Sequence, residues 1–249
     1  MNVTAQQREA FSLACERAAL SLRGQNGIGS LGEKTLHLAM KYFYEPEETR
    51  HERKVQGYVA DIFSERGVVE IQTARLDRLA PKIGAFLPVS DVLVVCPIAV
   101  EKWVIWVEPV SGAIGERRKS PAAARPLATV AELYALKPYL GAPGLSVDIA
   151  CLGVEEYRLL DGYGENKKKR ATKYEKVPVA LREILRLETA RDYARLLPDF
   201  LPDPFTSREL SAAAKIRVGD AQKALNVLHG VGAVARVGKR GNTYLYMRR

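Results

Sequence analysis

Two carboxylates and one amide fall within a short segment that is predicted to form a hairpin. Residues 57–63 and 67–73 both have strand-like patterns, and they flank a short polar turn. In such a hairpin Asp61 lies opposite Glu70, with Cβ atoms about 4.5–5.5 Å apart. Gln72 points to the same face as Glu70 because side chains alternate along a strand. The three side chains are therefore predicted to gather on one face.

Carboxylates at this spacing favour a bound cation. Two such groups repel each other unless a cation lies between them or one of them is protonated. The hairpin contains no His or Cys, and oxygen ligands suit Mg²⁺ (or Mn²⁺) rather than zinc. A metal ion of this kind can polarise a phosphodiester and lower the pKa of an attacking water. The alternative is an ordinary amphipathic hairpin whose acidic residues only face solvent.

The motif that runs from Asp61 to Glu70-Ile-Gln72 resembles that of the PD-(D/E)XK nuclease superfamily in its less common E-x-Q form. The resemblance covers roughly residues 25–100. It implies that Asp61 and Glu70 hold the metal ion. It also implies another acid from the preceding helix, and Glu33 is well placed for that role. The predicted catalytic set is Glu33, Asp61, Glu70 and Gln72, and the predicted metal ligands are the first three.

The third motif position departs from the usual pattern of this superfamily. A Lys usually stands there and orients or activates water, whereas Gln72 can act neither as a cation nor as a general base. Gln72 is instead expected to position water or phosphate. A Lys from another element could replace the missing cation. The candidates are Lys82 on the following predicted helix and Lys54 on the preceding strand.

The C-terminal segment has a second recognisable pattern. Thr206 is predicted to be a helix N-cap, with Glu209 three residues later completing a capping box. A second helix is expected over 219–229, where apolar residues recur at core spacing and glycines follow. Residues 231–237 and 243–247 are predicted to form two strands around a basic turn.

This order resembles a winged helix-turn-helix domain over residues 204–249. The resemblance implies a second helix that reads DNA and a hairpin that forms the wing. Predicted to face the major groove are Arg217, Gln222, Lys223 and Asn226. Predicted to approach phosphates or the minor groove are Arg236, Lys239 and Arg240. The alternative is a winged helix that binds another protein.

The positive charge is concentrated in the last third of the chain. The net charge is +9, and residues 204–249 alone carry nine Lys or Arg against two Asp or Glu. Residues 163–176 add six against two, which leaves the remainder slightly acidic. Basic residues confined in this way indicate a module that binds a polyanion. Predicted to add sequence-independent backbone affinity are Lys167, Lys168, Lys169 and Arg170.

The element order predicts the fold class. Two helices precede three strands, a helix and further strands, so we expect an α/β fold with a mixed-sheet, restriction-endonuclease-like core and a small C-terminal winged helix. The predicted boundaries are 1–162 for the nuclease-like domain, 163–203 for a basic and helical linker, and 204–249 for the winged helix-turn-helix domain. Within the linker a helix is expected over about 178–197.

Composition excludes several other classes. No run approaches the roughly 18 apolar residues that a membrane span needs, and the N-terminal residues contain no signal-peptide pattern. The three cysteines lie far apart without C-x-x-C spacing, which favours reduced thiols in the cytoplasm. No nucleophile elbow, P-loop or dinucleotide fingerprint occurs.

The sequence thus predicts a Mg²⁺-dependent DNA endonuclease, or a nuclease-fold DNA-processing protein, targeted by a winged helix. DNA is the expected partner, no membrane is expected, and a homodimer is left open. One alternative is a non-catalytic DNA-binding regulator that keeps the nuclease fold as a scaffold. Another is a sensor whose α/β domain binds a small effector.

Overall fold

The computed structural model describes residues 3–23, 34–162 and 171–249. The helices are α1 (Ala5–Arg23), α2 (Lys34–Tyr44), α3 (Ala80–Phe86), α4 (Pro126–Glu132), α5 (Ala190–Ala194), α6 (Ser207–Ala214) and α7 (Val218–Gly230), with 3-10 turns η1 (Glu48–Arg50), η2 (Leu76–Leu79) and η3 (Leu133–Leu136). The strands are β1 (His51–Val55), β2 (Tyr58–Ser64), β3 (Gly67–Ile71), β4 (Val92–Val107), β5 (Arg118–Lys119), β6 (Leu145–Leu159), β7 (Thr172–Leu187), β8 (Val234–Arg240) and β9 (Thr243–Arg248). None of the described helices combines the length and apolar character that spanning a bilayer requires.

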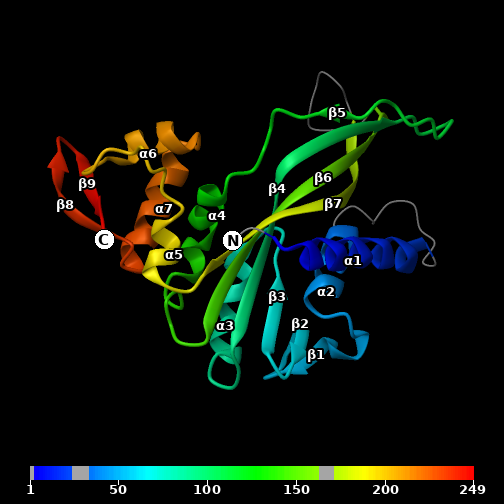
Figure 1. Cartoon of the computed structure of the whole chain (residues 1–249), viewed down its shortest axis with the longest axis horizontal. Coiled ribbons are helices and arrows are strands. Elements are labelled where there is room, and N and C mark those ends of the chain that lie inside the picture. The colour runs from blue at the N-terminus through cyan, green and yellow to red at the C-terminus, as the bar shows by residue number, and fades with distance from the viewer. Residues whose placement is uncertain (1–2, 24–33, 163–170) are drawn as a thin grey trace. The chain divides into compact units, whose positions relative to one another are not determined.

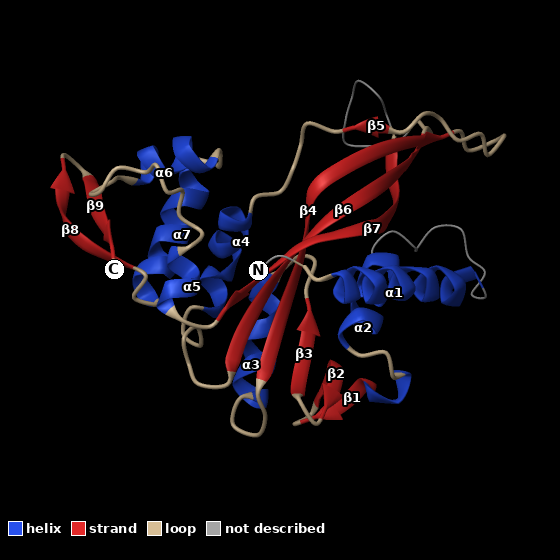
Figure 2. Ribbon diagram, viewed as in Figure 1, coloured by secondary structure: helices blue, strands red, loops and turns tan. Residues whose placement is uncertain are grey.

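The protein has a mixed α/β fold, as predicted (Figure 2). Within the described residues, seven strands form one sheet in the order β1-β2-β3-β4-β6-β7, and β5 pairs with β4. β2 and β3 are antiparallel, whereas β3 and β4 are parallel, so the sheet is mixed. β8 and β9 form a separate antiparallel hairpin.

The described chain divides into two compact units that are interleaved in sequence. The first unit comprises residues within 1–51, 97–124 and 150–184, and the second comprises 52–96, 125–149 and 185–249. The second unit contains the predicted acidic hairpin together with α3, α4 and all elements from α5 to β9 (Figure 1). Both predicted functional regions therefore belong to the same unit.

Two expected elements are wrong. Residues 92–107 form one continuous strand, β4, whereas the sequence pattern predicts two strands, over 91–98 and 102–109. The predicted linker helix is also absent from the described residues, since residues 178–187 belong to strand β7 and only the short α5 is helical. β7 is the last strand in the sheet order, and an edge strand tolerates Pro178, whose ring nitrogen cannot donate a hydrogen bond.

An ion pair between a buried carboxylate and a partly exposed guanidinium joins β6 and β7 within the second unit. Asp148 is 1% exposed, and two guanidinium nitrogens of Arg186 donate hydrogen bonds to its carboxylate. The bond from Nη2 to Oδ2 measures 3.0 Å, and Nε contacts Oδ1. Because a bidentate guanidinium fits a carboxylate in one orientation, this pair fixes the lateral register of the two strands.

Helix packing contributes to the hydrophobic core of each unit. In the first unit α1 packs on α2 through Ala14, Ala18, Ala39 and Tyr42. In the second unit α7 packs against α4, α6 and η3. Its fully buried residues are Ala221, Ala224, Leu225, Val227 and Leu228, four of which were predicted at core spacing.

Gly67 is required at the start of β3. Its φ is +106°, and a Cβ at this position would lie 2.4 Å from the carbonyl oxygen of Asp91. The amide of Val68 donates a 2.8 Å hydrogen bond to the same oxygen. The glycine therefore allows β3 to approach the beginning of β4, which fixes the hairpin against the sheet.

Candidate functional site

The β2–β3 hairpin brings the two predicted carboxylates together. Ile62 pairs with Val69 and Ser64 with Gly67, so Asp61 and Glu70 are the next opposed residues. The Oδ2 atom of Asp61 accepts a 2.8 Å hydrogen bond from the amide of Ile71, and the Oε1 atom of Glu70 accepts one of 3.3 Å from the amide of Asp61. Each carboxylate thus contacts the backbone of the opposite strand.

A lysine from α3 completes this cluster. The Nζ atom of Lys82 lies 2.8 Å from Oε2 and 3.1 Å from Oε1 of Glu70, and it also donates to the carbonyl of Val59 at 2.8 Å. The Glu70 side chain is 2% exposed and that of Lys82 is 27% exposed. Of the two lysines considered from the sequence, the structure thus places Lys82 against Glu70, whereas Lys54 lies exposed on β1.

The Gln72 side chain contacts the loop that follows β3. The backbone amide of Gln72 donates a 2.8 Å hydrogen bond to the carbonyl of Val95, which continues the pairing of β3 with β4. Its side-chain nitrogen contacts the carbonyl of Ala74 in the following loop. The side chain is therefore engaged with its own segment, and the cationic group beside Glu70 comes from α3.

Burial and like charge both act on Glu70. Burial raises the pKa of this carboxyl, and the neighbouring Asp61 carboxylate raises the pKa further. The ammonium group of Lys82 opposes both effects, yet the net pKa stays above its ordinary value. Glu70 is therefore a buried acid whose ionised form is disfavoured, and such groups are frequent at functional sites.

This pKa shift predicts a pH dependence of stability. Because the folded-state pKa of Glu70 is raised, the native protein binds the proton more tightly than the unfolded chain does. The contribution to stability is complete below the ordinary pKa of 4.5 and is lost as the pH rises through the raised value. We expect Glu70→Gln to remove this decline in the free energy of unfolding, as measured by urea denaturation across that pH range. Glu65→Gln, in the exposed turn of the same hairpin, should leave it intact; equal slopes in all three proteins would contradict the shift.

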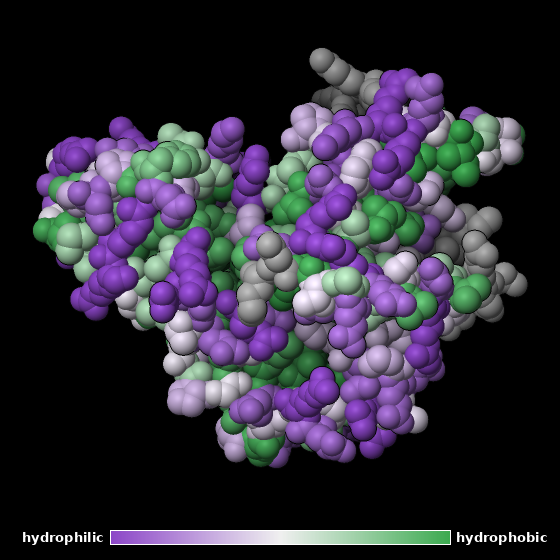
Figure 3. Space-filling view, viewed as in Figure 1, coloured by the Kyte–Doolittle hydropathy of each residue, from purple (hydrophilic) through white to green (hydrophobic). Residues whose placement is uncertain are grey.

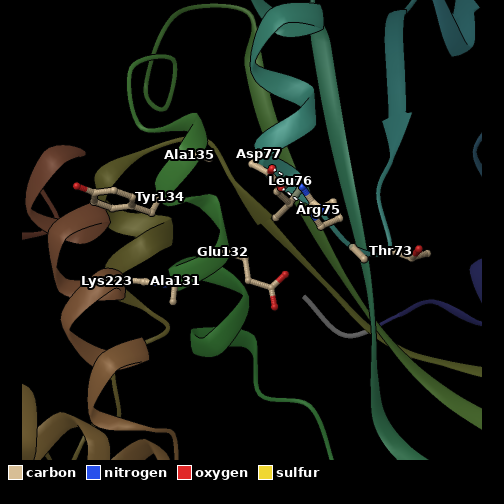
Figure 4. Close-up of a pocket in the computed structure, with 10 residues that line it drawn as sticks. Thr73, Arg75, Leu76, Asp77, Ala131, Glu132, Tyr134, Ala135 and Lys223 are labelled. Carbon is tan, nitrogen blue, oxygen red and sulfur yellow. Dashed lines mark hydrogen bonds and ion pairs between the residues drawn. The ribbon is translucent and has the colours of Figure 1, made fainter. Parts of the chain in front are cut away.

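A pocket of about 450 Å³ adjoins the loop that follows Gln72. One wall is formed by Thr73 to Asp77, and the others by four residues of α4 and η3 and by Lys223 of α7. Figure 4 shows the Glu132 carboxylate projecting from α4 toward the segment that carries Arg75 and Asp77. The loop that follows the acidic hairpin and the helix α7 therefore line the same pocket.

The C-terminal helices and hairpin form, but the first strand of the hairpin, β8, spans Val234–Arg240 where residues 231–237 were predicted, so Lys239 and Arg240 lie on a strand and not in the turn. Thr206 caps α6, and the Glu209 carboxylate accepts a 2.6 Å hydrogen bond from the Thr206 backbone amide, which confirms the capping box. α7 exposes Gln222 and Lys223, and Arg217 is exposed just before it. Hydrophilic side chains cover much of the surface around α6 and the β8–β9 hairpin in the view of Figure 3.

The three cations predicted on the wing have aromatic or acidic neighbours. The Arg236 guanidinium lies 4.5 Å from the centroid of the Tyr244 ring, and the Lys239 ammonium lies 5.0 Å from it. Arg240 forms a 2.9 Å ion pair with Glu209. All three side chains are exposed. Arg236 and Lys239 therefore lie close to the Tyr244 ring, and the ion pair of Arg240 with Glu209 connects the hairpin to α6.

Asn226 has a partner that the sequence did not indicate. Lys137, which follows η3, donates a 2.7 Å hydrogen bond from Nζ to Oδ1 of Asn226. No local sequence signal connects these residues, because they are 89 positions apart. The remaining predicted residues, Glu33 and the run 167–170, lie outside the described part of the chain.

The family described as a domain of unknown function (DUF8091) matches residues 34–188. The chain belongs to this family. A curated Treponema pallidum (strain Nichols) protein, described as uncharacterized, is 27% identical over 227 residues, or 88% of this chain and 86% of that protein. No solved structure matches.

The DUF8091 match includes one candidate region and excludes the other. Asp61, Glu70 and Lys82 lie inside the matched residues. The match ends at residue 188, before α6 begins at Ser207. The acidic cluster of Asp61, Glu70 and Lys82 therefore lies in the DUF8091 region. The helix and hairpin module, which consists of α6, α7 and the β8–β9 hairpin, follows it.

Proposed function

We propose that this protein is a metal-dependent deoxyribonuclease whose active site is formed by Asp61, Glu70 and Lys82. The observation that carries the proposal is the 2.8 Å contact between the Lys82 ammonium and the Glu70 carboxylate, opposite Asp61. The E-x-Q motif lacks a cation at its third position, and a lysine from α3 provides one beside the same carboxylate. This arrangement supports a nuclease-like core with a relocated lysine.

The donor set suits Mg²⁺ or Mn²⁺. Among residues 3–23, 34–162 and 171–249, no group of three or more His, Cys, Asp or Glu side chains could enclose a metal ion. Mg²⁺ does not require such a cage, because it commonly keeps several waters and binds one or two carboxylates together with phosphate oxygens. Asp61 and Glu70 would hold the ion, and it would polarise the phosphodiester and lower the pKa of a bound water.

The side chains of the cluster divide the remaining work. Asp61 and Glu70 keep their orientation through hydrogen bonds to the hairpin backbone. Lys82 is anchored by the Val59 carbonyl, so its ammonium can orient water or neutralise charge that develops on the phosphate. A rise of activity with pH is expected as Glu70 loses its proton, because only the ionised carboxyl attracts the cation.

The helix and hairpin module supports DNA as the substrate. We propose that α6, α7 and the β8–β9 hairpin form a winged helix, with α7 entering the major groove and the hairpin approaching the backbone. The exposed polar residues of α7, the cations carried on Tyr244 and the strongly basic composition of residues 204–249 support this assignment.

Asp61→Asn is expected to lower cleavage of supercoiled or branched DNA by at least about 100-fold, because it weakens the hold on the metal ion. The assay compares wild type, Asp61→Asn and Glu65→Gln with Mg²⁺ or Mn²⁺, and it measures DNA binding in parallel. Asparagine keeps the size of the side chain and an acceptor for the Ile71 amide. Glu65→Gln removes one negative charge from the same hairpin and should cleave normally.

The outcomes separate the proposal from its main alternative. Metal-dependent nicking that is lost in Asp61→Asn while binding persists would support the nuclease. Tight DNA binding without cleavage of any substrate by the wild type would favour a non-catalytic DNA-binding protein that keeps the fold as a scaffold.

A further inference from the structure

The contact between Lys137 and Asn226 fixes the orientation of an amide on α7. A lysine ammonium has three donors and no acceptor, so the group that faces it must be the amide oxygen. The 2.7 Å bond from Lys137 Nζ therefore occupies Oδ1 of Asn226 and turns its NH₂ group away from the lysine. The half-buried pair therefore offers a ligand two kinds of donor, the ammonium and the amide NH₂, while one of the two acceptor sites of Oδ1 is already used.

Lys137 is held in place by the surface of α7. A Cβ built on Gly230 would lie 2.7 Å from Cε of Lys137 and 3.5 Å from its Cγ. The lysine stem thus crosses α7 where a glycine leaves room for it, one turn beyond Asn226. Lys137 belongs to the DUF8091 region, so the exposed face of α7 is completed by a residue from outside the helix and hairpin module.

Further cations lie near His229, at the C-terminal end of α7. Burial lowers the pKa of His229 at the end of α7, and the charges of Arg236, Lys137 and Arg249 lower it further. The imidazole is therefore disfavoured as another cation. The lysine and the two arginines together make this end of α7 attractive to a polyanion.

We propose that Lys137 and Asn226 form a pair of donors, the ammonium and the amide NH₂, that selects guanine at one position of the bound DNA. This inference rests on the proposed entry of α7 into the major groove. Guanine presents two acceptors there, N7 and O6, which match the amide NH₂ and the ammonium. Adenine recognition by asparagine requires the amide oxygen to accept from the adenine N6 amino group. In this protein the Lys137 ammonium already donates to that oxygen and places a positive charge beside it, which disfavours a second donor there.

The test uses the full-length protein and selection from randomised DNA duplexes. The wild type should enrich a guanine, and replacement of that guanine by 7-deazaguanine should weaken binding about 10-fold, as for a lost specific contact. Lys137→Met keeps the stem over Gly230 and frees the amide oxygen. Its guanine preference over adenine should therefore disappear or reverse. Lys239→Met, on the wing, should weaken binding to all sequences equally.

Each outcome decides a different question. If the wild type binds DNA but tolerates 7-deazaguanine, or if Lys137→Met weakens all sequences equally, the pair contacts phosphate and the guanine inference is wrong. If the wild type binds no DNA, the proposed winged-helix function fails and the inference fails with it. Because 7-deazaguanine is tested with the wild type, this arm is independent of how the variants fold.

Discussion

Lys82→Met is expected to lower the free energy of unfolding by about 3 kcal/mol at neutral pH, because it leaves a buried carboxylate without its partner. Glu70 is 2% exposed, and both of its oxygens contact the Lys82 ammonium. The value lies at the lower end of the usual range because Glu70 can relieve part of the penalty by taking up a proton. We also expect DNA cleavage to fall by about 100-fold or more, as for loss of a group that moves or orients a proton.

Three companion proteins separate the structural role from the chemical one. Lys119→Met removes a lysine whose ion pair is exposed, so it should change stability by less than about 1 kcal/mol. The double variant Lys82→Met with Glu70→Gln should recover most of the stability, because no buried charge remains, but it should not cleave. Lowering the pH should shrink the defect of the single variant, since Glu70 becomes protonated. Full cleavage by folded Lys82→Met would remove this lysine from the mechanism.

Arg186→Met is expected to destabilise the protein by about 3–5 kcal/mol, as happens when one partner of a buried pair is lost. Asp148 is 1% exposed on β6, and the guanidinium of Arg186 bonds to both of its oxygens. Methionine preserves the aliphatic volume on β7 but supplies no donor, so the carboxylate must stay charged without its partner or take up a proton. Urea unfolding monitored by circular dichroism measures the difference directly.

Arg182→Met provides the matched control for this experiment. Arg182 stands on the same strand, but its ion pair with Glu101 is exposed. Such surface pairs contribute about 0–1 kcal/mol, so the control should unfold almost like the wild type. Addition of Asp148→Asn to Arg186→Met should restore part of the lost stability. Equal effects of the two single variants would show that burial of Asp148 is not what makes its pair important.

Local features were predictable from the sequence. The capping box of Thr206 and Glu209 depends on atoms within one helical turn, and it forms as expected. The hairpin that opposes Asp61 and Glu70 depends on a short turn between two alternating strands, and its register is also as expected. In both cases the residues that decide the structure are neighbours in the chain.

Interactions between distant elements were not predictable in the same way. Residues 180–187 contain good helix formers, yet pairing with β6 makes them part of β7. Pro178 and the absence of a clear helical stripe before it were the available signals for an edge strand. The contact of Lys137 with Asn226 left no signal, because it depends on how α7 packs beside η3.

The candidate site falls between these two cases. Its two carboxylates follow from strand pairing, whereas the choice between Lys82 and Lys54 required the position of α3 relative to the hairpin. The role assigned to Gln72 by its place in the motif was not supported by its side chain, which turns to Ala74. A spacing motif gives the direction of a side chain on an ideal strand, and Gln72 lies where β3 has already ended.

The interleaving of the two units limits how this protein could have changed by gene rearrangement. The chain passes between the units five times, so no single insertion or deletion could add or remove either one intact. A recombination event inside residues 52–184 would split both units at once. The stretch 204–249 is uninterrupted in sequence, but its helix α7 packs against α4 and η3. Exchange of that stretch would therefore also require a matching surface on residues 126–137.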